Sequence, residues 1–139
     1  MCKSGLAPSI NVLFSEPMAY DVALRRDLPS YWQCEFQSFS DDRELLEWVS
    51  GQSYDVVFCG LGLSFGASFF QASPETKLLA TPTTGLDHID LNAADEAGVR
   101  VVSLRGELDL LRRITSTAEH AWGLLLACNR RIPELVKRT

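Results

Sequence analysis

The hydrophobic positions of this chain fall into short runs separated by segments with helical spacing. Five runs read as strands, over residues 10–15, 32–39, 54–60, 77–81 and 99–104. They are largely continuous apolar stretches rather than alternating ones, so we expect strands that are buried on both faces, as in a parallel sheet.

The first two helices are predicted from their end signals. A helix is expected over residues 18–28, because Pro17 favours the first helical position and Pro29 closes the segment. A second helix is expected to start at Ser40 as its N-cap and to end just before Gly51.

The sequence predicts the remaining helices with signals of unequal strength. Residues 64–73 predict a short, weak helix. Asp90 is expected to cap the next one, and Gly98 to end it in the left-handed conformation. A long helix is expected over residues 116–131, where Pro133 breaks the pattern.

This alternation of strands and helices predicts an α/β fold. The expected architecture is a flavodoxin-like, doubly wound parallel sheet of five strands with a long C-terminal helix. We assign residues 1–112 to this domain and residues 113–139 to the helical segment, because the last helix has no sixth strand to return to.

Composition narrows the possible partners. The 139 residues are 46% hydrophobic with a net charge of -5, and the cations are scattered, so nucleic-acid binding is not expected. No apolar stretch approaches the roughly 20 residues of a membrane span, and the N-terminus lacks a secretory signal. We therefore expect a cytoplasmic protein that does not bind membranes.

The four cysteines predict reduced, packed thiols. Cys2, Cys34, Cys59 and Cys128 are widely spaced and form no C-x-x-C pair. We therefore expect neither a disulfide framework nor a metal site.

Candidate ligand-binding residues lie in the loops that follow the carboxyl ends of the strands, where ligands bind in a parallel sheet. The loops there cover residues 15–17, 59–62, 82–85 and 104–106, and two of them read CGLG and TPTTG. Backbone N–H groups of such small residues can hold an anion. Ordinary tight turns are the alternative explanation for the same composition.

No catalytic constellation is visible. His88 beside Asp87 is expected to make a loop hydrogen bond, with Asp87 bonding N–H groups of its own turn, and His120 to be exposed or packed on the last helix. Ser116 and Thr117 are expected to act as helix caps.

Two phosphate-related patterns are excluded. The glycines at positions 60, 62 and 66 miss the G-x-G-x-x-G spacing. A phospho-acceptor receiver domain needs acidic residues at the ends of the first and third strands. Ser15-Glu16 and Cys59-Gly60 stand there and supply no acceptor aspartate.

Residues 77–134 resemble the D-isomer-specific 2-hydroxyacid dehydrogenases. The resemblance runs through TTGLDHIDLNAADEAGVRVVSL, with the family's G-x-D-[NH]-[IL] turn, and then through TSTAEHAWGLLLACNRRIPE, with its R-R-x-P-E ending. The two segments occur in the family's order and spacing, whereas residues 1–76 match only in fold pattern. The second segment matches the family's long interdomain helix, so the resemblance implies that residues 113–139 lead to a cofactor domain that these residues do not contain.

The resemblance implies a role for two loops. Backbone amides at Thr83, Thr84 and Gly85 would hold the substrate carboxylate, and Gly60, Leu61 and Gly62 would line the other wall. Thr84 would lie nearest the nicotinamide, and Thr117 would contact the phosphates of the cofactor. The implied cofactor is NAD, with NADP not excluded. We also expect Gly85 to need a backbone geometry that a Cβ would strain.

This chain departs from the family in two places. The segment RGELDLLRRIT replaces a short loop before the long helix and is expected to be partly helical. The cofactor domain, with its G-x-G-x-x-G loop and the family's catalytic Arg, Glu and His, has no counterpart in these residues. We therefore expect a fragment that holds no catalytic residue, is inactive by itself and does not bind NAD tightly.

These observations favour the substrate-binding part of an NAD-dependent oxidoreductase that acts on the CH–OH group of D-2-hydroxy acids. The alternative is a non-enzymatic flavodoxin-like module that binds a protein partner through its terminal helix. Residues 118–127 of that helix are almost entirely apolar, which predicts a homodimer through this surface.

Overall fold

The computed structural model of the protein describes residues 9–16 and 26–136. The chain divides into two compact units after Arg105. The expected domain boundary between residues 112 and 113 stays a prediction.

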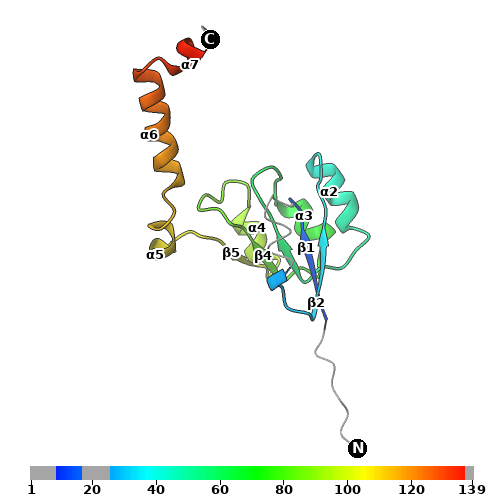
Figure 1. Ribbon diagram of the computed structural model, residues 1–139. Coiled ribbons are helices and arrows are strands. Elements are labelled where there is room, and N and C mark those ends of the chain that lie inside the picture. Colours follow the sequence, from blue (N-terminus) through cyan, green and yellow to red (C-terminus); the bar gives the residue numbers. More distant parts are fainter. Residues whose placement is uncertain (1–8, 17–25, 137–139) are drawn as a thin grey trace, which may run out of the picture. The chain divides into compact units, whose positions relative to one another are not determined.

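The first unit is built on a parallel five-stranded sheet (Figure 1). The strands are β1 (Ile10–Phe14), β2 (Trp32–Phe36), β3 (Val56–Phe58), β4 (Leu78–Ala80) and β5 (Arg100–Val102). Their order is β2-β1-β3-β4-β5, and every neighbouring pair is parallel. The order reverses at β1, as in a doubly wound sheet, which confirms the predicted fold class.

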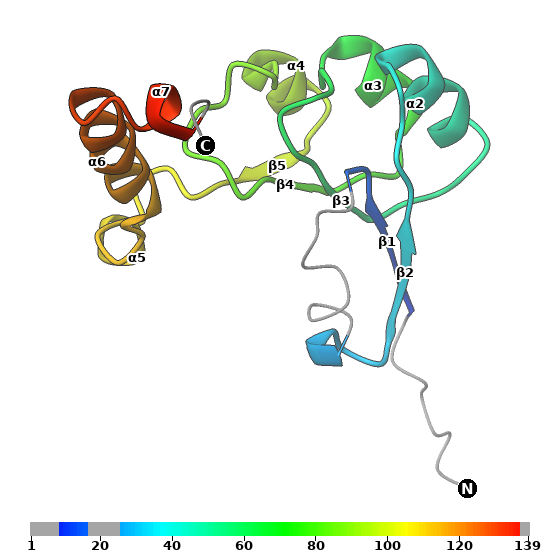
Figure 2. The same ribbon diagram turned by 45° about the horizontal axis from the view of Figure 1, so that its top comes forward.

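Three helices cover one face of this sheet (Figure 2). They are α2 (Asp42–Val49), α3 (Ala67–Ala72) and α4 (Leu91–Glu96). Leu13, Val57 and Leu79 of the strands form the main core with side chains of these helices. This core accounts for the apolar residues on one face of the strands.

The opposite face carries a second apolar cluster. Its centre is a stack in which the ring of Phe14 lies 4.4 Å from that of Phe36 and 4.6 Å from that of Phe58. The helix expected over residues 18–28 falls largely on residues 17–25, which lie outside the described part of the chain.

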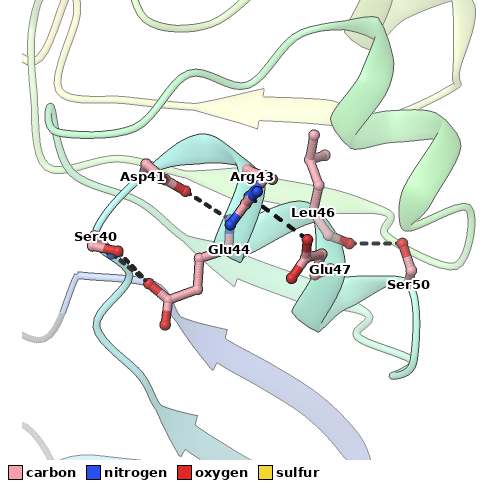
Figure 3. A network of polar contacts seen from close by, with 7 residues as sticks. All are labelled: Ser40, Asp41, Arg43, Glu44, Leu46, Glu47 and Ser50. Atoms are coloured by element: carbon pink, nitrogen blue, oxygen red, sulfur yellow. Dashed lines mark hydrogen bonds and ion pairs between the residues drawn. The ribbon is translucent and has the colours of Figure 1, made fainter.

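The N-terminus of α2 differs from the expectation. Asp41, not Ser40, is the N-cap, and its Oδ1 accepts a 2.8 Å hydrogen bond from the N–H of Glu44 (Figure 3). The N–H and hydroxyl of Ser40 both donate to Glu44 Oε2 at 2.7 Å, and these bonds lower the pKa of Glu44. Ser40 does not cap the helix, because its hydroxyl donates to the Glu44 carboxylate and the carboxylate of Asp41 takes the cap position.

The ends of α4 confirm the prediction. Asp90 Oδ1 accepts hydrogen bonds from the N–H groups of Asn92 and Ala93, both at 3.1 Å. Gly98 has φ 70°, the left-handed conformation that a residue without Cβ adopts at low cost.

The second unit contains α5 (Leu108–Leu111), α6 (Ser116–Asn129) and α7 (Ile132–Val136). The long helix and the helical segment before it are thus confirmed. No described helix is long and apolar enough to cross a bilayer.

Two details of the second unit differ from the expectation. Thr115 is the N-cap of α6, so neither Ser116 nor Thr117 caps it, and the Thr115 hydroxyl donates to Glu119 Oε1 at 2.7 Å. Pro133 does not end the helical structure, because it lies inside α7. The break occurs at Arg131, which has φ 52°.

Candidate functional site

The carboxyl ends of β1, β3 and β4 bring three loops to one edge of the sheet. Phe58 pairs with Phe14 on one side and with Ala80 on the other. Just beyond, the N–H of Ser15 donates to Phe58 O at 3.0 Å, and the N–H of Cys59 donates to Ala80 O at 2.9 Å. The loops expected to carry chemistry therefore start side by side, although Pro17 lies outside the described residues.

The loop after β4 is fixed through its hydroxyl and carbonyl groups. The hydroxyls of Thr81 and Thr83 lie 3.0 Å apart, and Thr83 Oγ1 donates to Gly85 O at 2.7 Å. The N–H of Leu104 donates to Thr83 O at 3.0 Å. The hydroxyl of Thr83 and the backbone of Leu104, in the segment after β5, thus hold the loop in place.

The N–H groups of the same loop remain available. Within residues 9–16 and 26–136, no acceptor is found for the backbone N–H of Thr83, Thr84 or Gly85. Thr84 and Gly85 are exposed, and Thr83 is half-buried. Consecutive unpaired donors are a backbone arrangement able to bind an anion.

The prediction that a Cβ would strain the backbone at Gly85 is wrong. Gly85 is not in the left-handed region, and a Cβ added there would meet nothing nearer than Asp87 Oδ2 at 3.7 Å. An ordinary side chain fits this position, so the glycine is not required by the loop geometry seen here.

The loop after β3 already holds a carboxylate. Glu16, which follows β1, accepts a 3.0 Å hydrogen bond on Oε1 from the N–H of Gly62. Gly60 is buried, and a Cβ there would lie 2.9 Å from Glu16 Cδ and closer still to Oε2. Gly60 therefore allows the carboxylate to approach the backbone.

A second carboxylate holds the same loop further along. Asp42 Oδ1, in the first turn of α2, accepts from the N–H of Ser64 at 2.9 Å. Sequence reasoning missed both Glu16 and Asp42. The only sequence signal for this contact was that an acidic residue, Glu16, directly follows the first strand. The sequence does not show that its side chain reaches the loop after β3.

Among the described residues of these loops, neither Cys59 nor Ser15 is an activated nucleophile. Burial raises the pKa of the Cys59 thiol to about 12, against a smaller opposing effect of its hydrogen bond with Thr81. Cys59 is therefore a neutral packed thiol at physiological pH. The Ser15 hydroxyl donates to Phe58 O at 3.1 Å and has no base beside it among the described residues.

The histidines form no acid–base pair in the described part of the chain. Both ring nitrogens of His88 are buried without a hydrogen-bond partner there, so the expected loop hydrogen bond is absent. The Asp87 side chain is exposed and bonds none of the described N–H groups of its turn. His120 is exposed on α6, as expected.

The other predicted positions are found on the surface. Leu61, between the two glycines of the β3 loop, is 68% exposed. Thr117 is exposed in the first turn of α6, in the second unit, and its expected contact with a cofactor stays a prediction. No group of three metal-ligating side chains occurs among the described residues.

Comparisons with known proteins identify a family. Residues 12–123 match the family model described as D-isomer specific 2-hydroxyacid dehydrogenase, catalytic domain. The chain is 30% identical over 128 residues to a D-3-phosphoglycerate dehydrogenase of Archaeoglobus fulgidus, and 35% identical over 83 residues to a glyoxylate reductase of Thermofilum pendens. These alignments cover 90% and 60% of the chain.

Solved structures show the same fold. The apo-structure of D-lactate dehydrogenase from Escherichia coli superposes with a TM-score of 0.71 at 20% identity, covering 94% of this chain and 40% of that one. The alignments with the two curated relatives span only 22% and 23% of the relatives' own lengths.

Proposed function

The chain belongs to the D-isomer specific 2-hydroxyacid dehydrogenase family, and from this membership we propose that it supplies the acid-binding part of a nicotinamide-dependent oxidoreductase. Such an enzyme acts on the CH–OH group of D-2-hydroxy acids and interconverts them with 2-oxo acids. The observation that carries the proposal is that the three consecutive N–H groups of Thr83, Thr84 and Gly85 have no acceptor in the described part of the chain.

In this proposal the carboxylate of the acid accepts hydrogen bonds from the loop after β4. Hydrogen bonds to an ionised acceptor are short and stronger than neutral ones. The contacts of Thr83 with Thr81 and Leu104 orient these donors before the acid binds. Gly60, Leu61 and Gly62 line the other side, where the exposed Leu61 offers an apolar surface.

The cofactor of the family is NAD, with NADP as the alternative, and when bound it exchanges a hydride with the carbon that bears the hydroxyl. Thr84 is exposed beside the acid-binding amides, so its position fits a contact with the nicotinamide. Thr117 is the second proposed contact. The chain has no G-x-G-x-x-G loop, so Thr84 and Thr117 are each proposed to supply only a minor contact with the cofactor.

We test the acid-binding role by calorimetric titration of the 139-residue chain with glycolate and with its neutral amide, glycolamide. Glycolate should bind at least about tenfold more tightly, because hydrogen bonds to a charged group contribute about 1.5–3 kcal/mol each. NADH in the same experiment should show no low-micromolar binding. Equal affinities for glycolate and glycolamide would refute carboxylate recognition, and micromolar NADH binding would refute the minor cofactor role.

We also propose that the chain forms a homodimer through α6. Trp122, Leu124, Leu125 and Leu126 are each more than half exposed on this helix. Large contiguous apolar surfaces are rare on monomers, and one such surface can serve both copies of a symmetric dimer. The same residues favour the competing function, a module that binds another protein through this helix. A cytoplasmic location stays part of the proposal.

Sedimentation velocity at micromolar concentration tests the dimer. The 15.4 kDa chain should sediment as a dimer, and the double change Leu124→Glu and Leu126→Glu should convert it to a monomer. Glu96→Gln, on α4 of the first unit, is the control and should leave the dimer intact. A wild-type monomer unaffected by the leucine changes would contradict self-association.

A further inference from the structure

The segment between Cys59 and Ser64 connects β3 with α3, and both of its ends are held by hydrogen bonds. The N–H of Cys59 donates to the end of β4 at 2.9 Å, and the N–H of Ser64 donates to Asp42 Oδ1 at 2.9 Å. Between these ends, the hydrogen bond found in the described part of the chain runs from the N–H of Gly62 to Glu16 Oε1, at 3.0 Å. The hydrogen bonding of this glycine-rich stretch therefore depends on one side chain that follows β1.

The two glycines of the stretch leave room for the Glu16 carboxylate. A Cβ on Gly60 would lie 2.9 Å from Glu16 Cδ, and a Cβ on Gly62 would lie 3.3 Å from Glu16 Oε1. Neither glycine has the left-handed conformation, which among the described glycines is found at Gly98 and Gly106. The glycines at positions 60 and 62 are thus explained by the close approach of a carboxylate to the backbone.

Glycine also leaves the backbone on both sides of Leu61 with more conformational freedom than any other residue would. Leu61 is 68% exposed, so its own packing does not fix its direction. A hydrogen bond to a carboxylate is stronger than one between neutral groups, and Gly62 makes such a bond directly after Leu61. The direction of the Leu61 side chain therefore depends on Glu16.

From these contacts we infer that Glu16 is a positioning residue, which holds the loop after β3 so that Leu61 faces the substituent of the bound acid. The inference rests on the proposed function, in which the acid's carboxylate lies at residues 83–85 and Leu61 lies on the other side. Glu16 acts through Gly62 and does not contact the acid. The site should therefore favour 2-hydroxy acids with an apolar substituent, and this preference should depend on Glu16.

Three substitutions separate the hydrogen bond from the charge of Glu16. Glu16→Gln keeps an oxygen that can accept from Gly62, whereas Glu16→Ala removes the acceptor. Gly60→Ala keeps Glu16 but places a methyl group where its carboxylate lies, so it also breaks the bond to Gly62. Adding Gly60→Ala to Glu16→Ala should change nothing further, because the remaining Cβ of residue 16 lies at 3.5 Å, an ordinary contact.

Calorimetric titration of the 139-residue chain with glycolate and with D-2-hydroxy-4-methylpentanoate tests the inference. Glycolate carries no substituent, and the second acid carries an isobutyl group. The wild-type chain should bind the second acid at least about fivefold more tightly, because the isobutyl group buries apolar surface against Leu61. In Glu16→Ala and in Gly60→Ala this preference should fall to within about twofold, with the glycolate affinity changed by less than about twofold. Glu16→Gln should keep the preference.

Two control variants should behave as wild type. A Cβ on Gly66 meets nothing within 4 Å in the described part of the chain apart from its chain neighbours, so Gly66→Ala matches Gly60→Ala. Glu96→Ala, in the last turn of α4, matches Glu16→Ala. Circular dichroism follows the folding of each variant.

The outcomes separate the inference from the proposed function. Equal affinities of the wild-type chain for the two acids, an unchanged preference in Glu16→Ala, or a preference lost equally in Glu16→Gln would overturn the inference alone. Loss of the fold in both Glu16→Ala and Gly60→Ala would overturn it too, because Glu16 would then serve the stability of the domain. If glycolate does not bind to the wild-type chain, the proposed function fails and the inference fails with it.

Discussion

Phe65→Ala is expected to lower the free energy of unfolding of the first unit by about 3–5 kcal/mol. Phe65 is 0% exposed, and its ring lies edge-on to Phe69 at 4.8 Å. Its N–H donates to His88 O at 2.8 Å, and its own carbonyl accepts from the N–H of Asp90 at 2.9 Å. Phe65 thus ties the segment after β3 to the segment after β4.

Urea denaturation followed by circular dichroism measures this loss. Leu61→Ala is the matched control, because Leu61 lies in the same connection but is 68% exposed, and it should change the stability by less than about 0.5 kcal/mol. A loss of less than 1 kcal/mol for Phe65→Ala would mean that the aromatic ring does not hold the two segments together.

Thr84→Pro is expected to weaken glycolate binding by about 10-fold or more. Proline removes the backbone N–H that the proposal places against the acid's carboxylate, and a hydrogen bond to a charged group is worth about 1.5–3 kcal/mol. Thr84 is exposed, so the loss should appear in the dissociation constant measured by calorimetry rather than in the melting temperature.

Thr84→Ala provides the comparison, because it keeps the N–H and removes only the side chain. It should bind glycolate within about threefold of wild type, provided that the backbone is the donor. A loss in Thr84→Ala as large as that in Thr84→Pro would assign the contact to the hydroxyl instead. Unchanged binding in both variants would remove Thr84 from the site.

The fold could be predicted because burial governs the strand pattern. Leu13, Val57 and Leu79 pack against the helices, and Val12 and Val56 are buried on the other face, so the central strands β1 and β3 are largely apolar on both faces, whereas β2 carries Gln33 and Glu35. The exact start of α2 could not be predicted in the same way. Two adjacent polar residues both suit an N-cap, and only the position of the Glu44 carboxylate decides between them.

The positions of the candidate loops at the ends of the strands could be predicted, but their contacts could not. The loop after β4 follows from the rule that ligands bind where parallel strands end. The reason for Gly60 could not be read from the sequence, because it depends on a side chain 44 positions earlier that reaches across from β1. At Gly85 the prediction failed in the other direction. The glycine in a turn suggested a strained backbone, but the observed backbone accepts a Cβ.

Backbone amide NMR of the ¹⁵N-labelled chain, titrated with glycolate, tests the central claim that the loop after β4 binds the acid's carboxylate. The amide signals of Thr84 and Gly85 should shift together and saturate with one dissociation constant. The signal of Gly62, which donates to Glu16, should move much less. A titration that leaves Thr84 and Gly85 unshifted while other amides respond would contradict the account.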